Sequence, residues 1–302
     1  MPEIAINLEG QNGLNWPRWK RIVRAVEDLG YAALTRSDHF TNPNPPDMDS
    51  LELWVSLTWL ADNTKRIEFG PLVSPVSFRH PAMTARMAAA VDDLSNGRLI
   101  LGVGAGWQVR EHHNFSYDLL ELPQRMARFQ EGLEIIHHLL KNDAPLDFPG
   151  QFYQMHEAVI LPRPQRPGGT RLLVGGNGPT RTLPLTAHFA DEWNGVFLPA
   201  ARYAELSGLL DDLLRAEGRE PSTVRRSLMT GIVFGRTEIE VSERLEGRDR
   251  GELRKRGVLV GTADEVADQV AELDAAGVQR LMLQWMDQDD IEGLEILARR
   301  LI

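Results

Sequence analysis

The sequence predicts an α/β protein with the (β/α)8 TIM-barrel fold. Short apolar strand-like segments alternate with longer amphipathic segments about eight times along the 302 residues, which is the pattern of parallel strands joined by helices. The length also fits, because barrels of this size commonly form one domain. We therefore expect residues 1–302 to form a single barrel domain, with a doubly wound parallel sheet as the alternative architecture.

The first half of the chain supplies four strand-helix units. Apolar residues recur three or four positions apart in the helices, and Gly30 and Pro81 stand where one helix ends and another begins. The expected strands span residues 4–6, 31–34, 67–73 and 98–103, and the expected helices span 16–29, 51–60, 81–96 and 126–140.

The second half resumes the alternation after an interruption. Residues 143–170 contain five prolines and are interpreted as an excursion with a hairpin at 152–161. The charged residues 236–257 favour a solvated helix or a mobile lid. The expected strands span 171–174, 193–198, 228–234 and 280–286, and the expected helices span 180–189, 202–216, 264–276 and 290–300.

Composition excludes several classes of function. The chain has no cysteine, which rules out disulfides, thiolate nucleophiles and iron–sulfur clusters. Its formal net charge of −10 opposes binding to nucleic acid, which needs a basic face. No run approaches the roughly 20 apolar residues that cross a bilayer, and the amino terminus lacks the basic start of a signal peptide. A cytoplasmic protein without a membrane partner is expected.

The stretch "TRSDHF", residues 35–40, follows the second predicted strand. The carboxyl ends of barrel strands form the active site, so this position favours function. His39 is the candidate catalytic residue because its ordinary pKa, about 6.5, allows proton exchange near neutral pH. A histidine bonded within a turn is the simpler interpretation. Asp38 is expected to orient the imidazole or to bind a cofactor, and Phe40 to serve packing.

Two segments interrupted by glycine or proline follow the third and fourth strands. In "FGPLVSPVSFRHP", residues 69–81, the glycine and prolines predict either a ragged strand end or, as we prefer, a bulge that presses the backbone against a flat ligand. In "LGVGAGW", residues 101–107, alternating glycines let a ligand approach the backbone closely. Taken alone, Trp107 is expected to pack against the protein and Glu111 to be a solvated acid.

The segment "LLVGGNGPTRT", residues 172–182, predicts either a phosphate-binding turn or a simple tight turn. A glycine-rich turn leads into a helix near Pro179. The free N–H groups and the positive end of the dipole at a helix start favour an anion, and Arg181 adds charge.

Metal and serine-hydrolase chemistry are not expected. His112 and His113, like His137 and His138, are neighbours in sequence, so on a helix their side chains point about 100° apart and cannot chelate one ion. The chain also lacks the H-E-x-x-H and G-x-S-x-G motifs.

Taken together, "SDHF", the segment running from "GPLVSP" to "GVGAGWQVREH", and "LLVGGNGPTRTLPLTAHFADEWN" resemble the bacterial luciferase-like flavin monooxygenase family. The similarity covers most of the chain in the right order and is most specific over residues 66–112. The sequence resembles the branch of that family that uses the deazaflavin coenzyme F420, whereas other members use reduced FMN.

The resemblance implies that a deazaflavin ring lies across the carboxyl mouth of the barrel. It places a non-prolyl cis peptide bond between Pro71 and Leu72 to support the ring, and it makes His39 the proton donor or acceptor beside the reacting carbon. The other residues assigned to cofactor binding are Asp38, Ser74, Ala105, Gly106 and Trp107, and, around the phosphate, Gly175, Gly176, Asn177, Gly178 and Pro179.

The sequence departs at two places from the sugar-phosphate dehydrogenases of this branch. Those enzymes carry an acid after the glycine loop, where this chain has Trp107, and a tryptophan shortly after the histidine, where this chain has Thr41, Asn42 and Pro43. Their substrate therefore does not carry over.

Three functions remain open. The first is hydride transfer between F420 and a small organic substrate, with His39 handling the proton. The second is a monooxygenase that uses O2 and reduced FMN supplied by a separate reductase. The third is a barrel that only binds flavin. The family resemblance and the tryptophan-rich first helix also imply a homo-oligomer, expected to be a dimer.

Overall fold

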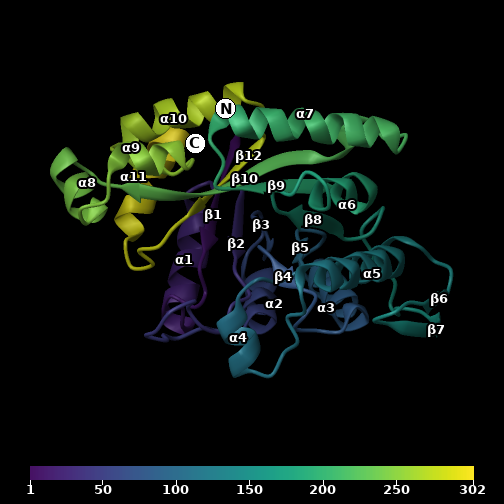
Figure 1. The fold of residues 1–302 in the computed structure, drawn as a ribbon. Coiled ribbons are helices and arrows are strands. Elements are labelled where there is room, and N and C mark those ends of the chain that lie inside the picture. Colours follow the sequence, from purple (N-terminus) through teal and green to yellow (C-terminus); the bar gives the residue numbers. More distant parts are fainter.

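The computed structural model describes residues 1–302 and shows a parallel barrel enclosed by helices (Figure 1). The strands are β1 Glu3–Leu8, β2 Ala33–Arg36, β3 Glu68–Pro71, β4 Ser74–Pro75, β5 Ile100–Gly104, β6 Leu146–Pro149, β7 Gln154–Ala158, β8 Arg171–Gly175, β9 Glu192–Val196, β10 Arg225–Phe234, β11 Leu259–Gly261 and β12 Arg280–Gln284.

The barrel strands follow one another in chain order, β1, β2, β3, β5, β8, β9, β10 and β12, and β12 pairs with β1. Strands β3 and β4 together occupy one position in the barrel. Strand β4 pairs with β5, and a bridge between Phe69 and Leu99 joins β3 to the segment before β5. All of these pairings are parallel. The (β/α)8 fold predicted from the sequence is confirmed.

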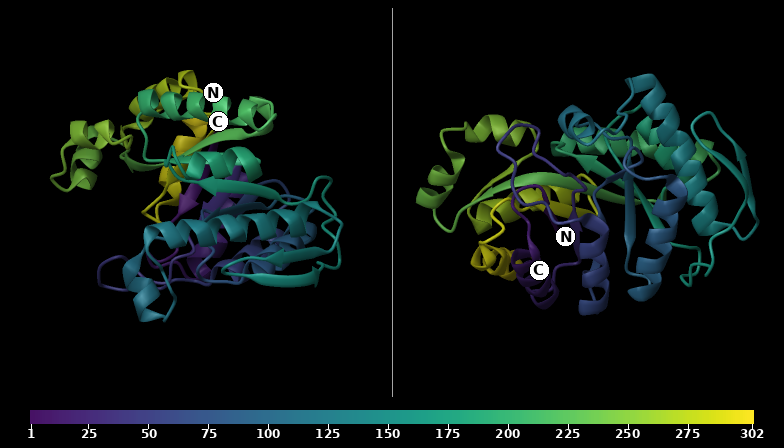
Figure 2. Two further views of the ribbon diagram at one scale, coloured as in Figure 1. Left: turned by 45° about the vertical axis from the view of Figure 1, so that its right-hand side comes forward. Right: turned by 90° about the horizontal axis from the view of Figure 1, so that it is seen from below.

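The helices lie outside the barrel and begin and end close to the expected positions (Figure 2). In α1, the side chain of Asn15 accepts a hydrogen bond from the N–H of Arg18, and Gly30 follows the helix at a φ of 93°, which suits a residue without a Cβ. The helices are α1 Trp16–Asp28, α2 Leu53–Asn63, α3 Pro81–Leu94, α4 Val109–Asn114, α5 Leu122–Lys141, α6 Thr182–Phe189, α7 Ala200–Ala216, α8 Glu238–Leu245, α9 Arg250–Lys255, α10 Ala263–Ala275 and α11 Ile291–Leu301, with the 3-10 turn η1 Pro221–Thr223.

Burial divides the apolar side chains into two main sets. The larger, of 61 residues, fills the space between the strands and the surrounding helices. The smaller set of seven lies inside the barrel and comes from successive strands, as expected for inward-pointing strand residues: Ala5, Ala33, Leu72, Ile100, Leu173, Met229 and Met282.

The third strand is interrupted one residue later than expected. The non-prolyl cis peptide bond joins Leu72 to Val73, so its placement between Pro71 and Leu72 was wrong. Leu72 still takes part in the sheet, because its N–H donates to the carbonyl of Arg36 at 2.7 Å. The break therefore follows Leu72 and separates β3 from β4.

Three local features differ from the sequence-based expectations. The hairpin is formed by β6 and β7, earlier than residues 152–161. Residues 236–257 form two short helices, α8 and α9, and a further strand, β11, pairs with β10. Helix α4 follows the glycine loop after β5, where no helix was expected. Helices α8 and α9 and the hairpin extend from opposite sides of the barrel (Figure 1).

No helix in the structure combines the length and apolar character that a membrane span requires.

Candidate active site

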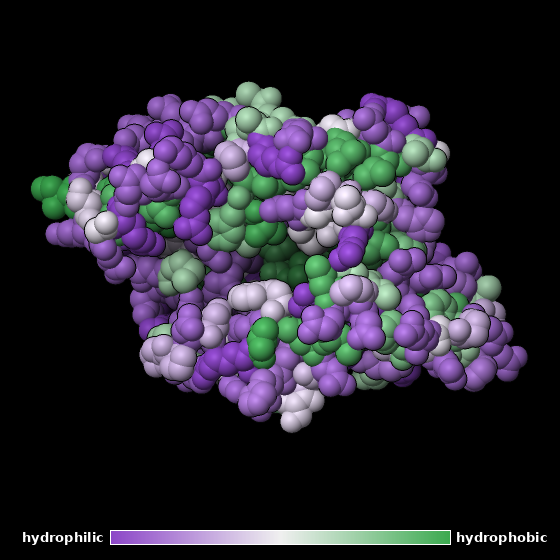
Figure 3. Space-filling model, in the orientation of Figure 1, coloured by the Kyte–Doolittle hydropathy of each residue, from purple (hydrophilic) through white to green (hydrophobic).

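A cavity of about 640 Å³ lies at the carboxyl ends of the barrel strands. Residues that follow β1, β2, β5, β9 and β12 line it, together with the interrupted segment between β3 and β4. Figure 3 shows a hollow near the centre of the face turned to the viewer, with hydrophobic side chains at its bottom. This is the end of the barrel at which (β/α)8 enzymes hold their ligands.

Seven of the residues assigned from the sequence line this cavity: His39, Leu72, Ala105, Gly106, Trp107, Gly175 and Gly176. The other assigned residues lie outside its lining: Asp38, Pro71, Ser74, Asn177, Gly178 and Pro179.

His39 is held by a carboxylate that was expected from the sequence to be solvated. Its Nδ1 lies 2.8 Å from Oε1 of Glu111. An ionised carboxylate can only accept, so Nδ1 carries a hydrogen. The other ring nitrogen, Nε2, is then left to act on a ligand. The ring of Trp107 meets that of His39 edge-on, with centroids 5.4 Å apart, and limits how the imidazole can turn.

Glu111 is buried, with 1% of its surface exposed, so its interpretation as a solvated acid was wrong. Helix α4 folds back over the end of β2, and Oε2 of Glu111 also accepts the N–H of Phe40 at 3.1 Å. The sequence offered one weak signal, an acid within a few residues of a glycine loop at a strand end. Only the return of α4 to β2 in space pairs the acid with His39.

The environment of His39 favours its protonated form. Burial lowers the pKa of His39, but the hydrogen bond and charge of Glu111, assisted by the charges of Glu9 and Asp38, outweigh burial and raise this pKa above its ordinary value. His39 is therefore placed to hold a proton near neutral pH.

Glu9 is a second carboxylate in the cavity, just after β1. Its Oε1 accepts from Gln284 at 2.7 Å, and its Oε2 accepts from Gln11 at 2.9 Å. Amide donors hold this carboxylate and no arginine or lysine pairs with it, so its negative charge remains in the cavity.

Asp38 serves the structure beneath the cavity. Its carboxylate is 97% buried by surface area, forms an ion pair with Arg79, and accepts the hydroxyl of Ser74 at 2.8 Å. Neighbouring residues at a strand end point to opposite sides, so Asp38 faces away from the cavity when His39 faces into it. Asp38 and Ser74 hold the loop after β2 against the interrupted third strand.

Phe40 packs as expected. Its ring stacks on that of Phe78 with centroids 4.5 Å apart and lies edge-on to Phe115 at 5.1 Å. This aromatic cluster anchors the segment that carries His39.

The turn after β8 is fixed to the neighbouring strand. Both side-chain groups of Asn177 bond the backbone of Val196, with Oδ1 accepting its N–H at 2.9 Å and Nδ2 donating to its carbonyl at 2.7 Å. The amide of Asn177 is thus occupied by the protein itself. The backbone N–H groups of Gly178 and Arg181 donate to no other backbone group.

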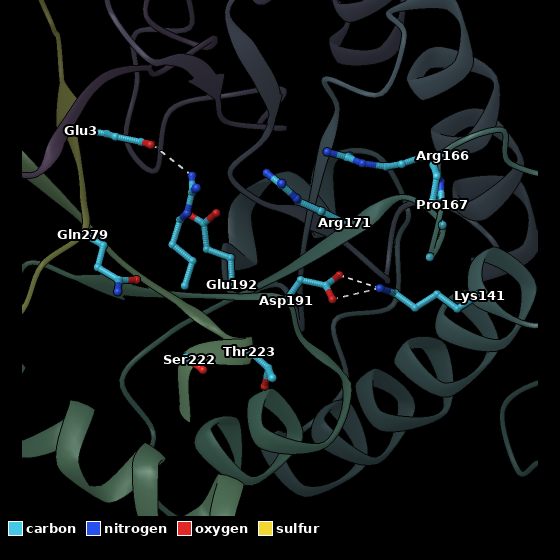
Figure 4. A pocket seen from close by; sticks show the side chains of 13 residues that line it. Glu3, Lys141, Arg166, Pro167, Arg171, Asp191, Glu192, Ser222, Thr223 and Gln279 are labelled. Atoms are coloured by element: carbon cyan, nitrogen blue, oxygen red, sulfur yellow. Dashed lines mark hydrogen bonds and ion pairs between the residues drawn. The ribbon is translucent and has the colours of Figure 1, made fainter. Parts of the chain in front are cut away.

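A second cavity, of about 650 Å³, lies at the opposite end of the barrel, where the strands begin (Figure 4). Charged side chains of its lining are paired: Lys141 binds Asp191, Arg225 binds Glu3, and Glu3 and Glu192 also bind Arg280, which is buried outside the lining. Paired charges at the amino end of a barrel stabilise the fold, so this cavity is not the candidate active site.

The fold and the carboxyl-end cavity with its histidine–carboxylate pair define a (β/α)8 enzyme. The sequence profile of the family described as luciferase-like monooxygenase matches residues 5–250, and the chain belongs to this family. The resemblance found in the sequence motifs is thereby confirmed, and the protein is an oxidoreductase or monooxygenase of the luciferase-like family.

Curated relatives use different chemistries. The chain is 26% identical to a 4-hydroxyprotoasukamycin monooxygenase of Streptomyces nodosus subsp. asukaensis, over 95% of this chain and 86% of that protein. It is 34% identical to an F420-dependent glucose-6-phosphate dehydrogenase of Amycolatopsis mediterranei, but only over 51% of this chain and 46% of that protein. A phthiodiolone/phenolphthiodiolone dimycocerosates ketoreductase of Mycobacterium bovis is 28% identical, over 82% of this chain and 64% of that protein.

Solved structures share the fold at low sequence identity. An F420-dependent secondary alcohol dehydrogenase in complex with an F420-acetone adduct superposes with a TM-score of 0.86 at 17% identity, covering 100% of this chain and 98% of that one. The monooxygenase RslO1 of Streptomyces bottropensis superposes with a TM-score of 0.80 at 21% identity, with coverage of 100% and 98%.

Proposed function

We propose that the protein is a coenzyme F420-dependent oxidoreductase that transfers a hydride between the deazaflavin and a small organic substrate. The observation that carries the proposal is His39, which lines the cavity and whose Nδ1 is held by Glu111 at 2.8 Å. Hydride transfer to a carbonyl needs a proton for the oxygen, and a buried histidine with a raised pKa supplies one.

The cavity wall fits a flat ring. Val73 lies between two glycines: a Cβ on Gly104 would stand 2.5 Å from Cγ2 of Val73, and a Cβ on Gly175 would stand 3.2 Å from its Cγ1. Only residues without a Cβ leave room for Val73 in this wall. Leu72, Val73 and the glycine backbone therefore form a smooth apolar surface of the kind that a flat ring packs against.

The turn after β8 supplies the phosphate site of the proposal. Gly175 and Gly176 line the cavity, and the N–H groups of Gly178 and Arg181 are free of backbone partners at the approach to α6. Arg181 adds a positive charge at the same helix start, which favours an anion.

The bound deazaflavin would accept or supply the hydride, and the residues of the chain would transfer the proton that accompanies it. In alcohol oxidation, His39 takes the hydroxyl proton on Nε2 while the carbon loses a hydride. In carbonyl reduction, His39 returns a proton to the oxygen while the carbon gains a hydride. Glu111 keeps the hydrogen on Nδ1 and stabilises the imidazolium in both directions.

The alternative is a monooxygenase that uses O2 and reduced FMN delivered by a separate reductase. The relative that supports it is the 4-hydroxyprotoasukamycin monooxygenase, which is matched over 95% of this chain. The smooth wall beside Val73 would accept either ring. In the monooxygenase, His39 would give its proton to an oxygen atom derived from O2 rather than to a substrate carbonyl.

Fluorescence titration of the purified protein with F420 and, separately, with FMN tests the proposal. We expect F420 to bind and to be reduced or oxidised when an alcohol or ketone is added, and FMN to bind at least tenfold more weakly. Tight binding of reduced FMN, with O2 consumption and no response to F420, would establish the monooxygenase instead. If His39→Ala retained the full turnover of every substrate tried, His39 would not be the proton-transfer residue. If the native protein bound F420 but turned over no substrate, its role would reduce to cofactor binding.

A glycine variant tests the position of the ring. Gly104→Ala should displace Val73 and weaken F420 binding about tenfold or more, because the added Cβ requires the wall to move. Gly208→Ala is the matched control, because a Cβ on that glycine of α7 meets nothing within 4 Å. Equal F420 affinity in the two folded variants would remove Val73 and Gly104 from the binding site.

A further inference from the structure

The mouth of the carboxyl-end cavity is unusually apolar for an exposed surface. Trp107, Phe197 and Met286 all line the cavity, yet they are 59%, 37% and 51% exposed. Large apolar side chains grouped around one opening mark a surface that binds an apolar partner or ligand. They come from the loops after β5, β9 and β12, so they surround the opening from several sides.

The backbone at Phe197 is strained in a way that fixes its ring at this mouth. Phe197 has a φ of 50°, in the left-handed region that aromatic residues rarely adopt. Such a conformation costs on the order of 1–3 kcal/mol and persists where the surroundings impose it. Its N–H donates to the carbonyl of Met229 at 2.9 Å. Its ring packs against Gly231, because a Cβ added to that glycine would lie 3.1 Å from Cε1 of Phe197.

The cavity is lined by acidic side chains but by no basic lysine or arginine. The two carboxylates are those of Glu9 and Glu111. The imidazolium of His39 is already paired with Glu111, so an anionic group entering the cavity would lose its hydration without gaining an unpaired cation, next to the charge of Glu9. The part of the cavity lined by Glu9 and Glu111 therefore disfavours a carboxylate or phosphate on the substrate, whereas the cofactor phosphate of the proposed function would lie at the turn after β8.

A second hollow adjoins the mouth at Met286. It is a cavity of about 420 Å³ whose lining combines apolar residues, among them Ile232, Phe234 and Trp285, with the charged residues Arg244, Glu246, Arg248 and Asp287. A long ligand crossing Met286 would place the end of its apolar body against Ile232 and Phe234.

We infer that the substrate is an uncharged molecule with a carbonyl or hydroxyl group at His39 and an extended apolar body over Trp107, Phe197 and Met286. The reacting group of this inference rests on the proposed function. The apolar and uncharged character of the body rests on the lining of the cavity alone.

Calorimetric titration with two ketones of similar size tests the inference. Benzylacetone is the uncharged probe, and benzylacetone bearing a para-carboxylate is its anionic counterpart. We expect the uncharged ketone to bind at least tenfold more tightly. Equal affinity, or tighter binding of the carboxylate, would overturn the inference.

Three variants locate the binding surface. Trp107→Ala and Met286→Ala should each weaken benzylacetone binding threefold or more, because they remove apolar contact at the mouth. Ile239→Ala is the matched control, because Ile239 is 74% exposed on α8 and lines neither cavity. If the control weakened binding as much as the other two, or if none of them did, the mouth would not be the surface that binds the body.

A charge added to the lining provides a gain-of-binding test. Asn12→Lys places an unpaired cation in a lining that has no lysine or arginine, so it should raise the affinity for the para-carboxylate fivefold or more while a thermal melt shows the fold intact. No gain in the folded variant would mean that charge does not select the substrate.

Running these titrations with and without saturating F420 separates this inference from the proposed function. Preference for the uncharged ketone in a protein that binds neither F420 nor FMN would support the inference and refute the proposed function. Binding of F420 without that preference would refute the inference alone.

Discussion

Glu111 and His39 are 72 positions apart in the sequence, yet Oε1 of Glu111 lies 2.8 Å from Nδ1 of His39 at the wall of the carboxyl-end cavity. A second pair of the same kind, His188 and Glu217, lies on the surface with its side chains 57% and 43% exposed. The buried pair lines a cavity and has a raised histidine pKa, whereas the surface pair faces solvent. The surface pair is therefore a control built into the same chain.

Glu111→Gln should reduce kcat/KM on the order of 10²-fold, the lower range for losing a positioned acid–base group. The glutamine keeps the size of the side chain but removes the charge that stabilises the imidazolium. Glu217→Gln makes the same chemical change at the surface pair and should leave activity unchanged. Steady-state kinetics on both variants give the comparison, and equal activity in the two would show that Glu111 does not act through His39.

The pH dependence of activity should follow the raised pKa of His39. Carbonyl reduction needs the protonated imidazole, so kcat/KM should be constant at low pH and fall as pH rises through this pKa. Alcohol oxidation needs the neutral imidazole and should rise over the same range. In Glu111→Gln the opposing effect of burial remains, so both curves should move to lower pH. A pH–rate profile of the two enzymes shows whether the curves move, and unmoved curves would assign the titration to another group.

The same pKa shift should contribute to stability. A group whose pKa is higher in the folded chain binds protons more tightly there, so its contribution is fully present below the ordinary histidine pKa of about 6.5. That contribution is lost as pH rises through the pKa of folded His39. Urea unfolding at several pH values should show this loss in the native protein but not in His39→Gln. The same pH dependence in both proteins would contradict it.

The barrel could be predicted from the sequence because its signals are local. Apolar strand segments, helical periodicity and glycine or proline at the helix ends each depend on a few neighbouring residues. The position of His39 followed from the same reasoning, since a residue directly after a barrel strand belongs to the carboxyl end.

Pairings between distant residues could not be predicted in this way. Glu111 was interpreted as solvated because its partner comes from a different strand-helix unit, and nothing within its own segment reveals that α4 returns to β2. Asp38 was expected at the cofactor because it adjoins His39, but Arg79, 41 positions later, draws its carboxylate to the other side. Helix α4 itself was missed because six residues carry too little periodicity.

Asp38→Asn should destabilise the fold more than it affects the chemistry. Removing the charge leaves Arg79, with a side chain only 16% exposed, facing a neutral amide and the half-exposed Glu52. Breaking such a buried pair costs about 3 kcal/mol. The free energy of unfolding from urea titration should fall by this amount, while kcat under stabilising conditions changes less than threefold. A large loss of F420 affinity without loss of stability would show instead that Asp38 binds the cofactor.

A homodimer remains our proposal for the assembly, and the surface of α1, α2 and α3 is where we expect it to form. Val55 and Leu94 are 57% and 44% exposed there and join Trp16 and Trp59 around a shallow hollow. Pairing with a second copy would remove these side chains from water. Light scattering should give about twice the 33.9 kDa of one chain, and Val55→Glu should reduce this to one chain because it buries an unpaired charge at the contact. Ile239→Glu adds the same charge to exposed α8 and should leave the dimer intact. A monomeric native protein, or a dimer unaffected by Val55→Glu, would exclude this surface as the interface.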